Sequence, residues 1–463
     1  MAQGIENIGK RDVAWSYAST IFLMGAGVIL LPFILNKMSE ETVGVWQLFQ
    51  TITALVLILD FGFRPTFARN LSYIFSGVST LLPEGVQTVP SGTEQASVDY
   101  SLLKGALIAM QRFYRKMALA AFLILATVGT AYFVYILNKY SGDRVDAIVA
   151  WCMLISINCY NLYTLYYDAL LLGKGYVLRS QQITIIGQCA YLLIALGMIY
   201  AGFGLSAIVA AQLISIVIRR WLSYKVFYTQ ELKEKLAATD AQDPKMVMRA
   251  IYPNAVKIGL TQVGSFAVNK SSMLIGSAFL SLEAIASYGI TLQVLEVLCH
   301  CSTVPYKTFL PKLAQFRTEK NLPELRRYYL INVFCIVAVY LIGGIVCVAF
   351  GNDILRLIKS QTFFLPSAMF IVLIITHFLE ENHASAAGFI MADNKIPFFI
   401  PSLVSGAATI LLLWLFLGPL HWGVWGMILA PGIAQVAYQN WKWPSVLIRE
   451  LWGKTDDLYL GEG

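Results

Sequence analysis

The chain has 463 residues, of which 57% are hydrophobic and only 13% are charged, and its formal net charge is +7. Charged residues make up about a quarter of an ordinary soluble domain, so this composition excludes a soluble enzyme and indicates that lipid is the main solvent. The basic residues are dispersed among apolar stretches, which is typical of anchoring to anionic membrane lipids and argues against nucleic-acid binding.

Twelve apolar stretches between Val13 and Trp441 are each long enough to cross a bilayer, whose core of about 30 Å takes about 20 helical residues. They are continuously apolar, whereas the strands of a membrane barrel alternate at every second residue. We therefore predict an all-α polytopic membrane protein of about twelve transmembrane helices. The predicted spans cover residues 13–36, 43–63, 117–137, 147–172, 182–202, 203–224, 255–280, 284–305, 329–350, 364–391, 397–417 and 423–441.

The basic residues fall almost entirely on alternate connections between these spans. With the N-terminus inside the cell, 27 of the 34 Lys and Arg lie on cytoplasmic segments. Membrane proteins carry their excess of Lys and Arg on the cytoplasmic side, so both termini are predicted to be inside. The five basic residues on outer connections are Lys37, Lys139, Arg144, Arg356 and Lys359.

The second half of the chain resembles the first. Near the start of each half, five positions align at an offset of 242 residues; they are Ser39, Glu41, Val43, Gly44 and Trp46 with Ser281, Glu283, Ile285, Ala286 and Tyr288. Further on, three positions align at an offset of 219; they are Leu172, Gly173 and Val177 with Met391, Ala392 and Ile396. The smaller offset locates an insertion in the first half, which we assign to the Gly-, Ser- and Pro-containing stretch 76–100, a predicted cytoplasmic loop.

This repeat predicts two pseudo-symmetric six-helix bundles. We expect bundles at 1–228 and 246–441, a charged cytoplasmic linker at 229–245 and a cytoplasmic tail at 442–463. Each bundle has an even number of spans, so the two enter the membrane in the same direction. Paired bundles of this kind commonly enclose a midplane site that opens to either side in turn, and an alternating-access transporter is therefore the leading functional class.

Ionisable residues inside spans are costly and mark candidate functional positions. In the first half, Asp60 and Arg64 lie one helical turn apart, as a structural ion pair or as a gate for an anionic substrate. In the second half, Lys257 lies near the inner end of its span and Lys270 about 20 Å deeper. We expect Lys270 to face a wet cavity or an acidic partner, and we favour the cavity.

Five further residues are possible partners of Lys270 or ligands of a coupling ion. Glu296 lies in the eighth predicted span, and the other four lie within two turns of the tenth; they are His377, Glu380, Glu381 and His383. A carboxylate beside an imidazole suits H⁺ or Na⁺ coupling, but a carboxylate that neutralises Lys270 would be purely structural. We predict no cofactor and no metal site, because the adjacent Cys299, His300 and Cys301 point about 100° apart on a helix.

Several short motifs resemble those of polysaccharide transporters, a family that includes the Wzx-type O-antigen flippases of the multidrug, oligosaccharidyl-lipid and polysaccharide exporter superfamily. They are Leu31, Pro32, Phe33, Ile34 and Leu35, then Ser39, Glu41, Gly44 and Trp46, and then Leu59, Asp60, Phe61 and Gly62 with Arg69. The two six-helix bundles extend this resemblance over nearly the whole chain.

The resemblance implies a flippase in the bacterial cytoplasmic (inner) membrane. Its substrate would be a polyprenyl-diphosphate-linked oligosaccharide, moved to the outer face for surface polysaccharide such as the O-antigen of lipopolysaccharide. Arg64, Lys257 and Lys270 would then compensate the diphosphate. The implied partners are the lipid-linked oligosaccharide, membrane lipids, and glycan polymerase and chain-length proteins.

Two alternatives stay open from the residues. A cation-coupled multidrug antiporter of the same superfamily would use Glu296, Glu380 or Glu381 as cation sites. A membrane glycan polymerase or acyltransferase would use His377 or His383 as a general base. Such an enzyme should present a substantial external loop, and the outer connections here are short. The chain has no phosphate-binding loop, which argues against direct ATP hydrolysis.

Overall fold

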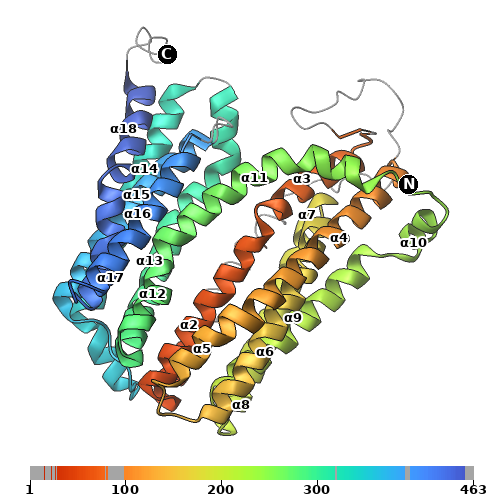
Figure 1. The fold of residues 1–463 in the computed structure, drawn as a ribbon. Helices are drawn as coiled ribbons and strands as arrows, with labels where there is room; N and C mark the ends of the chain where they lie inside the picture. The colour runs from red at the N-terminus through yellow and green to blue at the C-terminus, as the bar shows by residue number, and fades with distance from the viewer. Residues whose placement is uncertain are drawn as a thin grey trace. The chain divides into compact units, whose positions relative to one another are not determined.

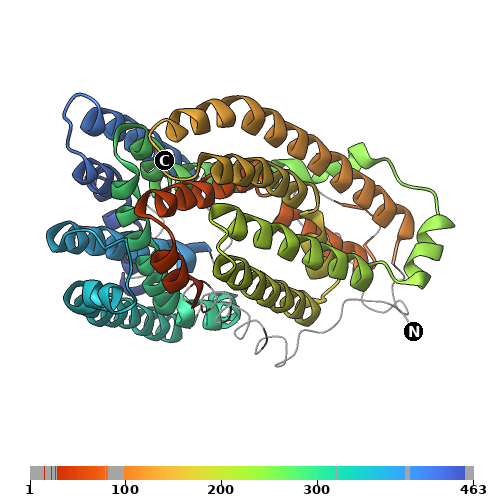
Figure 2. The same ribbon diagram turned by 90° about the horizontal axis from the view of Figure 1, so that it is seen from below.

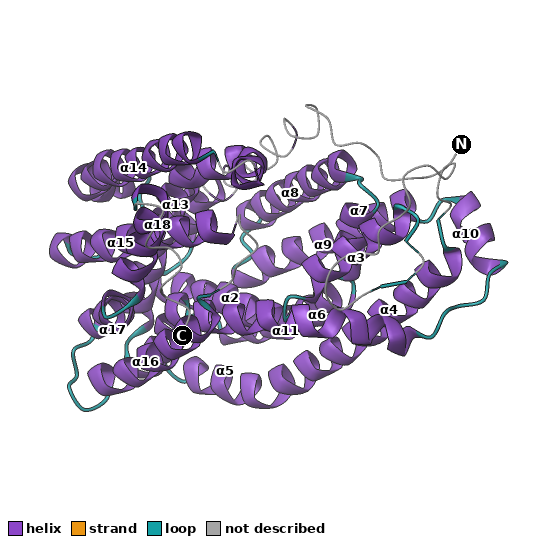
Figure 3. Cartoon of the chain, turned by 90° about the horizontal axis from the view of Figure 1, so that it is seen from above, coloured by secondary structure: helices purple, strands orange, loops and turns teal. Residues whose placement is uncertain are grey.

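The computed structural model of the chain is built from helices (Figure 1). It describes residues 29–78, 80–81, 98–318, 321–391 and 397–453, together with four isolated positions before residue 29. Within these residues there is no strand (Figure 3). The predicted all-α fold is confirmed.

The chain divides into two compact units. The first contains Met1–Met38 and Ile52–Gln262, and the second contains Ser39–Thr51 and Val263–Gly463. Both boundaries fall inside helices, at residues 51/52 of α2 (Glu40–Leu57) and 262/263 of α11 (Pro244–Asn269).

The first unit consists mainly of long helices that follow one another through short turns. Residues 29–37 are helical, and the later elements are η1 (Ile58–Asp60), α3 (Phe63–Phe75), α4 (Tyr100–Ile124), the π-helical segment η2 (Leu125–Gly129), α5 (Thr130–Leu137), α6 (Arg144–Tyr163), α7 (Tyr166–Gly173), α8 (Val177–Tyr200), α9 (Leu205–Phe227) and α10 (Gln230–Ala237). Helix α8 packs along α9, and the two are visible as neighbours in olive and green in Figure 2.

The second unit follows the same plan. Its helices are α12 (Ser271–Phe279), α13 (Leu282–Thr318), α14 (Leu322–Leu357), α15 (Ser367–Met391), α16 (Phe399–Leu417), α17 (Val424–Val436) and α18 (Gln439–Trp452). Helix α13 packs on α14, α16 on α17, and α15 on α18. The stretch 229–245, predicted as a linker, holds α10 and the start of α11, and residues 442–452 of the predicted tail continue α18.

Eight segments of the described chain are long and apolar enough to cross a membrane, and each matches one predicted span. They are Glu40–Asp60, Tyr100–Leu137, Arg144–Gly173, Val177–Tyr200, Leu205–Phe227, Leu282–Thr303, Leu322–Leu357 and Phe399–Leu417. The other four predicted spans differ for identifiable reasons. Most of 13–36 lies outside the described residues, 255–280 breaks at Lys270, 364–391 carries four ionisable residues within two turns, and 423–441 is divided between α17 and α18.

The element boundaries repeat at the larger offset of 242. Helix α2 begins at Glu40 and α13 at Leu282. A serine precedes each start, and its Oγ accepts the backbone N–H three residues later, at 3.3 Å from Thr42 to Ser39 and at 3.4 Å from Ala284 to Ser281. The helical residues 29–37 correspond in the same way to α12.

The smaller offset of 219 reappears where α9 and α17 begin. Gly204 precedes α9 and Gly423 precedes α17. Two residues earlier, Gly202 (φ 88°) and His421 (φ 51°) both adopt the left-handed conformation that reverses the chain. The change of offset therefore lies between α2 and α9, a range that includes 76–100, most of which lies outside the described residues.

At Gly44 the N-terminal part of α2 meets the start of α13. A Cβ at Gly44 would stand 2.3 Å from the carbonyl oxygen of Leu282, which is a backbone atom and cannot rotate away. We predict that Gly44→Ala lowers the free energy of unfolding by about 1–3 kcal/mol, as overpacking does. Thermal unfolding in detergent micelles measures the effect.

The matched control is Gly197→Ala in α8. A Cβ at Gly197 would meet nothing within 4 Å. Alanine is about 1 kcal/mol more favourable than glycine inside a helix, so this variant should be as stable as the parent or more stable. Equal melting temperatures for both variants would contradict the proposed close approach.

Candidate functional site

The second unit contains a polar cavity of about 280 Å³, which we call the amide cavity. Four carboxamide side chains line it together with an ion pair and an indole; they are Gln47, Gln50, Asn269 and Gln293, with Lys270 and Glu296, and Trp46. They come from α2, the junction of α11 and α12, and α13. Four carboxamides and two opposite charges are an unusual concentration of polarity for helices that cross a membrane.

A break in the helix places Lys270 in this cavity. Helix α11 ends at Asn269 and α12 begins at Ser271, and Lys270 between them has φ −125° and ψ −15°. Its ammonium pairs with the carboxylate of Glu296, and the side chains remain 35% and 49% exposed. The structure thus gives Lys270 both the cavity and the acidic partner that the sequence offered as alternatives; its functional role stays a prediction.

Helix α2 supplies another part of the wall of the amide cavity. Gln47 Nε2 donates to Gln293 Oε1 at 3.1 Å. Gly289 makes room for this bond, because a Cβ there would stand 2.6 Å from Gln47 Cγ. Trp46 is only 5% exposed, and its indole N–H has no acceptor among the described residues. A buried donor left unsatisfied costs about 1–3 kcal/mol, so an acceptor at this position would be stabilising.

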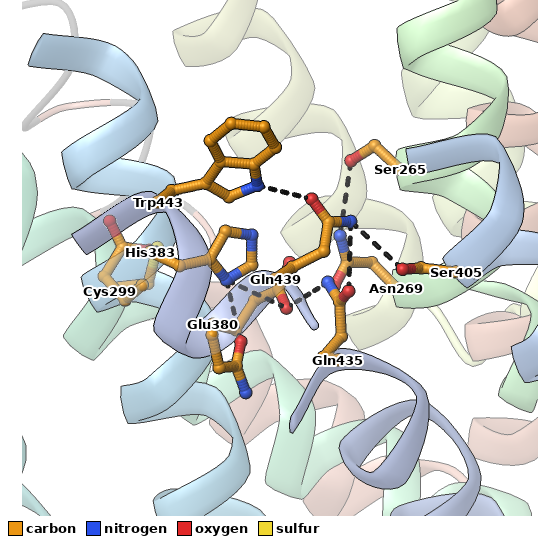
Figure 4. Close-up of polar contacts among 11 residues, drawn as sticks. Ser265, Asn269, Cys299, Glu380, His383, Ser405, Gln435, Gln439 and Trp443 are labelled. Atoms are coloured by element: carbon orange, nitrogen blue, oxygen red, sulfur yellow. Dashed lines mark hydrogen bonds and ion pairs between the residues drawn. The ribbon is translucent and has the colours of Figure 1, made fainter. Parts of the chain in front are cut away.

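A second polar cluster lies on α15, α17 and α18 (Figure 4). A chain of donors ends at one carboxylate: Trp443 Nε1 donates to Gln439 Oε1 at 2.8 Å, Gln439 Nε2 donates to Gln435 Oε1 at 3.2 Å, and Gln435 Nε2 donates to Glu380 Oε2 at 2.6 Å. The break between α17 and α18 at Tyr438 separates Gln435 from Gln439 without interrupting the bond between them. Glu380 is therefore the acceptor on which this cluster converges.

Glu380 also stands beside His383 and a small cavity. His383 Nδ1 is 3.7 Å from Glu380 Oε2 and 2.9 Å from Asn440 Oδ1. An amide oxygen only accepts, so Nδ1 of His383 carries a proton in this arrangement. The cavity has about 30 Å³, roughly the volume of one water molecule, and its walls include Asn269, Thr376, His377 and Glu380.

The neighbouring carboxylate faces another helix. Glu381 Oε2 lies 2.8 Å from Cys299 Sγ on α13. The two adjacent glutamates of α15 therefore contact different parts of the second unit. Within the part of the chain that the structure describes, no three His, Cys, Asp or Glu side chains gather closely enough to hold a metal ion.

Asp60 bonds to the backbone of Arg64 and not to its side chain, which one of the two predicted roles required; the other role, a gate, stays a prediction. Phe61 (φ 47°) and Gly62 (φ 72°) adopt left-handed conformations that end the helix before Arg64, so the two residues do not lie on one continuous helix. Asp60 is buried and instead accepts from the backbone N–H of Arg64 at 3.1 Å and from the hydroxyl of Tyr114 at 2.6 Å. The Arg64 side chain is exposed.

Of the other predicted site residues, Lys257 lies in α11, and its side chain is outside the described residues. The sequence interpretation missed the carboxamides Gln47, Gln293, Gln435 and Gln439. Gln435 and Gln439 are four residues apart in an apolar span, a spacing that places both on one helical face and was the available signal.

A buried ion pair in the first unit was also missed. Arg220 Nη1 of α9 lies 2.6 Å from Asp168 Oδ1 of α7, and Arg220 Nη2 donates to Asn161 Oδ1 at 2.9 Å. The side chain of Arg220 is 4% exposed. The Asp168 carboxylate is thus engaged by a partner within the same unit.

No protein-family model matches the sequence, and no curated protein matches it. Solved structures do share its fold. An inward-facing multidrug resistance MATE-family transporter of the MOP superfamily aligns with a TM-score of 0.65 and 14% identity, over 94% of this chain and 95% of its own. The lipid II flippase MurJ, in an inward closed conformation, aligns with a TM-score of 0.60 and 14% identity, over 95% of this chain and 87% of its own.

A third similar structure is a MOP-superfamily transporter from Pyrococcus furiosus, described as having a binding pocket of reverse polarity. It aligns with a TM-score of 0.55 and 15% identity, over 96% of this chain and 97% of its own. At these identities the comparisons establish the fold, which is that of multi-pass membrane transporters and flippases.

The Arg220–Asp168 pair predicts a large difference between single and double variants. Arg220→Leu leaves the Asp168 carboxylate without its partner, so we expect the free energy of unfolding to fall by about 3–5 kcal/mol. The double variant Arg220→Leu/Asp168→Leu should recover most of that loss, because no uncompensated charge remains. Unfolding in detergent with both variants measures the difference.

An exposed pair in the same unit is the control. Lys235 Nζ lies 2.6 Å from Glu231 Oε1 on α10, and their hydrogen bond lowers the pKa of Glu231 and raises the pKa of Lys235. Because both side chains are in water, Lys235→Gln should have little measurable effect on stability. Equal losses for Arg220→Leu and Lys235→Gln would show that the Arg220 pair is not buried as described.

Proposed function

We propose that this protein is a flippase that moves polyprenyl-diphosphate-linked oligosaccharides from the cytoplasmic to the outer face of the bacterial cytoplasmic membrane. The observation that carries the proposal is the amide cavity with Lys270 at its wall, inside a fold shared with a lipid II flippase. Carboxamides both donate and accept hydrogen bonds, as sugar hydroxyls do. An ammonium group compensates the anionic part of such a cargo.

The mechanism we infer is alternating access. The cargo's sugars and diphosphate would enter the polar interior while its polyprenyl chain stays in the bilayer, because only the polar part pays a penalty in hydrocarbon. Arg64 and Lys257 are proposed to contact the diphosphate near the cytoplasmic side. Lys270 is proposed to contact it deeper in the membrane. The delivered cargo would then pass to a glycan polymerase and the proteins that set chain length.

A second candidate function is a cation-coupled multidrug antiporter. The fold is equally that of the MATE multidrug transporter DinF-BH, solved with a bound ligand, at a TM-score of 0.59 and 14% identity. The observation that favours this reading is Glu380, a carboxylate held by Gln435, next to His383 and a water-sized cavity. H⁺ or Na⁺ bound there is also a possible energy source for the flippase.

The first prediction concerns Lys270. In liposomes with a defined polyprenyl-diphosphate glycan, the parent should transfer the glycan between leaflets unchanged. Lys270→Gln should reduce the rate by about tenfold, the equivalent of one lost charge-assisted hydrogen bond of about 1.5 kcal/mol. Lys235→Gln, the same substitution in exposed α10, should transport at the parental rate. Undiminished transport by Lys270→Gln would remove the anion contact.

The second prediction concerns Glu380. If this carboxylate binds the coupling cation, Glu380→Gln should make glycan transfer independent of imposed H⁺ and Na⁺ gradients, because the amide neither titrates nor binds a cation as a carboxylate does. Transfer is measured with each gradient imposed separately. A variant that still responds to both gradients would exclude Glu380 as the coupling site. Gradient-driven efflux of a cationic dye without any glycan transfer would favour the antiporter.

A further inference from the structure

The amide cavity has the size and polarity for one sugar ring and not for a whole oligosaccharide. Its volume of about 280 Å³ is at the lower limit of ligand pockets, which begin near 300 Å³. Its four carboxamides offer donors and acceptors on several sides, a set that matches hydroxyl groups. The Trp46 side chain lines the same cavity, and its buried indole N–H has no acceptor among the described residues.

The ion pair between Lys270 and Glu296 in this cavity is weak enough for a ligand to separate it. Lys270 and Glu296 are 35% and 49% exposed, and pairs with that much solvent contact contribute little free energy. The pair differs in this respect from Arg220 and Asp168, whose side chains are only 4% and 21% exposed. Arg220 also has a second partner in Asn161. The Glu296 carboxylate therefore occupies the position beside Lys270 that the oxyanion of a ligand would take. Because the ion pair contributes little free energy, a ligand can replace Glu296 there.

We propose, on the basis of the flippase function above, that the amide cavity binds one sugar residue bearing an oxyanion, and that binding transfers the Lys270 ammonium from Glu296 to this ligand. The oxyanion is a phosphate next to the first sugar or the carboxylate of an acidic sugar. The carboxamides hold the ring hydroxyls, and Lys270 holds the charge. Glu296 acts as an internal competitor that keeps Lys270 paired when the cavity is empty.

This exchange has a consequence for charge. The empty cavity holds one ammonium and one carboxylate, so the pair is neutral, whereas a bound monoanion leaves the released Glu296 carboxylate uncompensated. The Glu296 side chain is 49% exposed, so its released carboxylate is left in contact with solvent.

The test is a binding measurement on the full chain in lipid nanodiscs. Titration calorimetry is carried out with glucose, glucose 1-phosphate and glucuronate, three probes that share the pyranose ring. We expect both anionic probes to bind more tightly than glucose. Glu296→Gln should strengthen both by about three- to tenfold, because the competitor is gone. Lys270→Gln should abolish their advantage over glucose. Glu231→Gln, the same substitution in exposed α10, should change nothing.

The two anionic probes distinguish the sources of the oxyanion. A larger gain for glucose 1-phosphate in Glu296→Gln assigns the subsite to the phosphate-linked sugar, and a larger gain for glucuronate assigns it to an acidic sugar. Equal affinity of all three probes for the parent, or unchanged anion affinity in Glu296→Gln, overturns the proposal. The double variant Lys270→Gln/Glu296→Gln leaves no unpaired charge. If Lys270→Gln alone fails to fold, the double variant replaces it in the comparison of the anionic probes with glucose.

The liposome experiment separates this inference from the proposed function. Parental glycan transfer together with equal binding of all three probes would reject the subsite and leave the flippase intact. Absence of transfer by the parent with a broad panel of glycans would reject the flippase itself.

Discussion

The constraint that organises this protein is that a charge carried into a membrane-spanning helix must be compensated where it stands. Asp60 receives a tyrosine hydroxyl and a backbone N–H, Arg220 receives Asp168, Lys270 receives Glu296, and Glu380 receives an amide. Most of these contacts join different helices, so compensation also fixes which helices meet. The solvent exposure of the side chains then distinguishes the two ion pairs. The Arg220–Asp168 pair is largely buried, whereas the Lys270–Glu296 pair faces a cavity.

The fold could be predicted wherever hydrophobicity alone decides it. Largely apolar segments such as Val177–Tyr200 form single helices that are long and apolar enough to cross a membrane, and the repeat at two offsets reappears in the starts of α2 and α13 and of α9 and α17. The sequence could not show that a span breaks at Lys270, because the break depends on a partner from another helix and on the cavity around it. Nor could it show that the chain would divide inside α2 and α11, since that depends on tertiary contacts.

The site was predictable in its charges and not in its neutral polar groups. Lys270 and Glu296 were identified as possible partners because an ionised group in lipid needs one, and the structure pairs them. Asp60 contacts the backbone of Arg64 and not its side chain, because two left-handed residues, Phe61 and Gly62, change the direction of the chain between them. The carboxamides of the cavity carry no charge, so nothing in the sequence required them to converge; their meeting is a product of packing between distant segments.

The position of Thr51 in α2 has a mechanical consequence. The boundary between the two units follows Thr51, whose hydroxyl donates to the carbonyl of Gln47 at 3.0 Å, a back-bond of the kind that bends helices. Helix α2 runs unbroken through this boundary, from Glu40 to Leu57. Gln47 and Gln50 line the amide cavity from this same helix. Bending of α2 would therefore change the shape of the cavity wall, and a ligand that fits one curvature would set the tension in the helix.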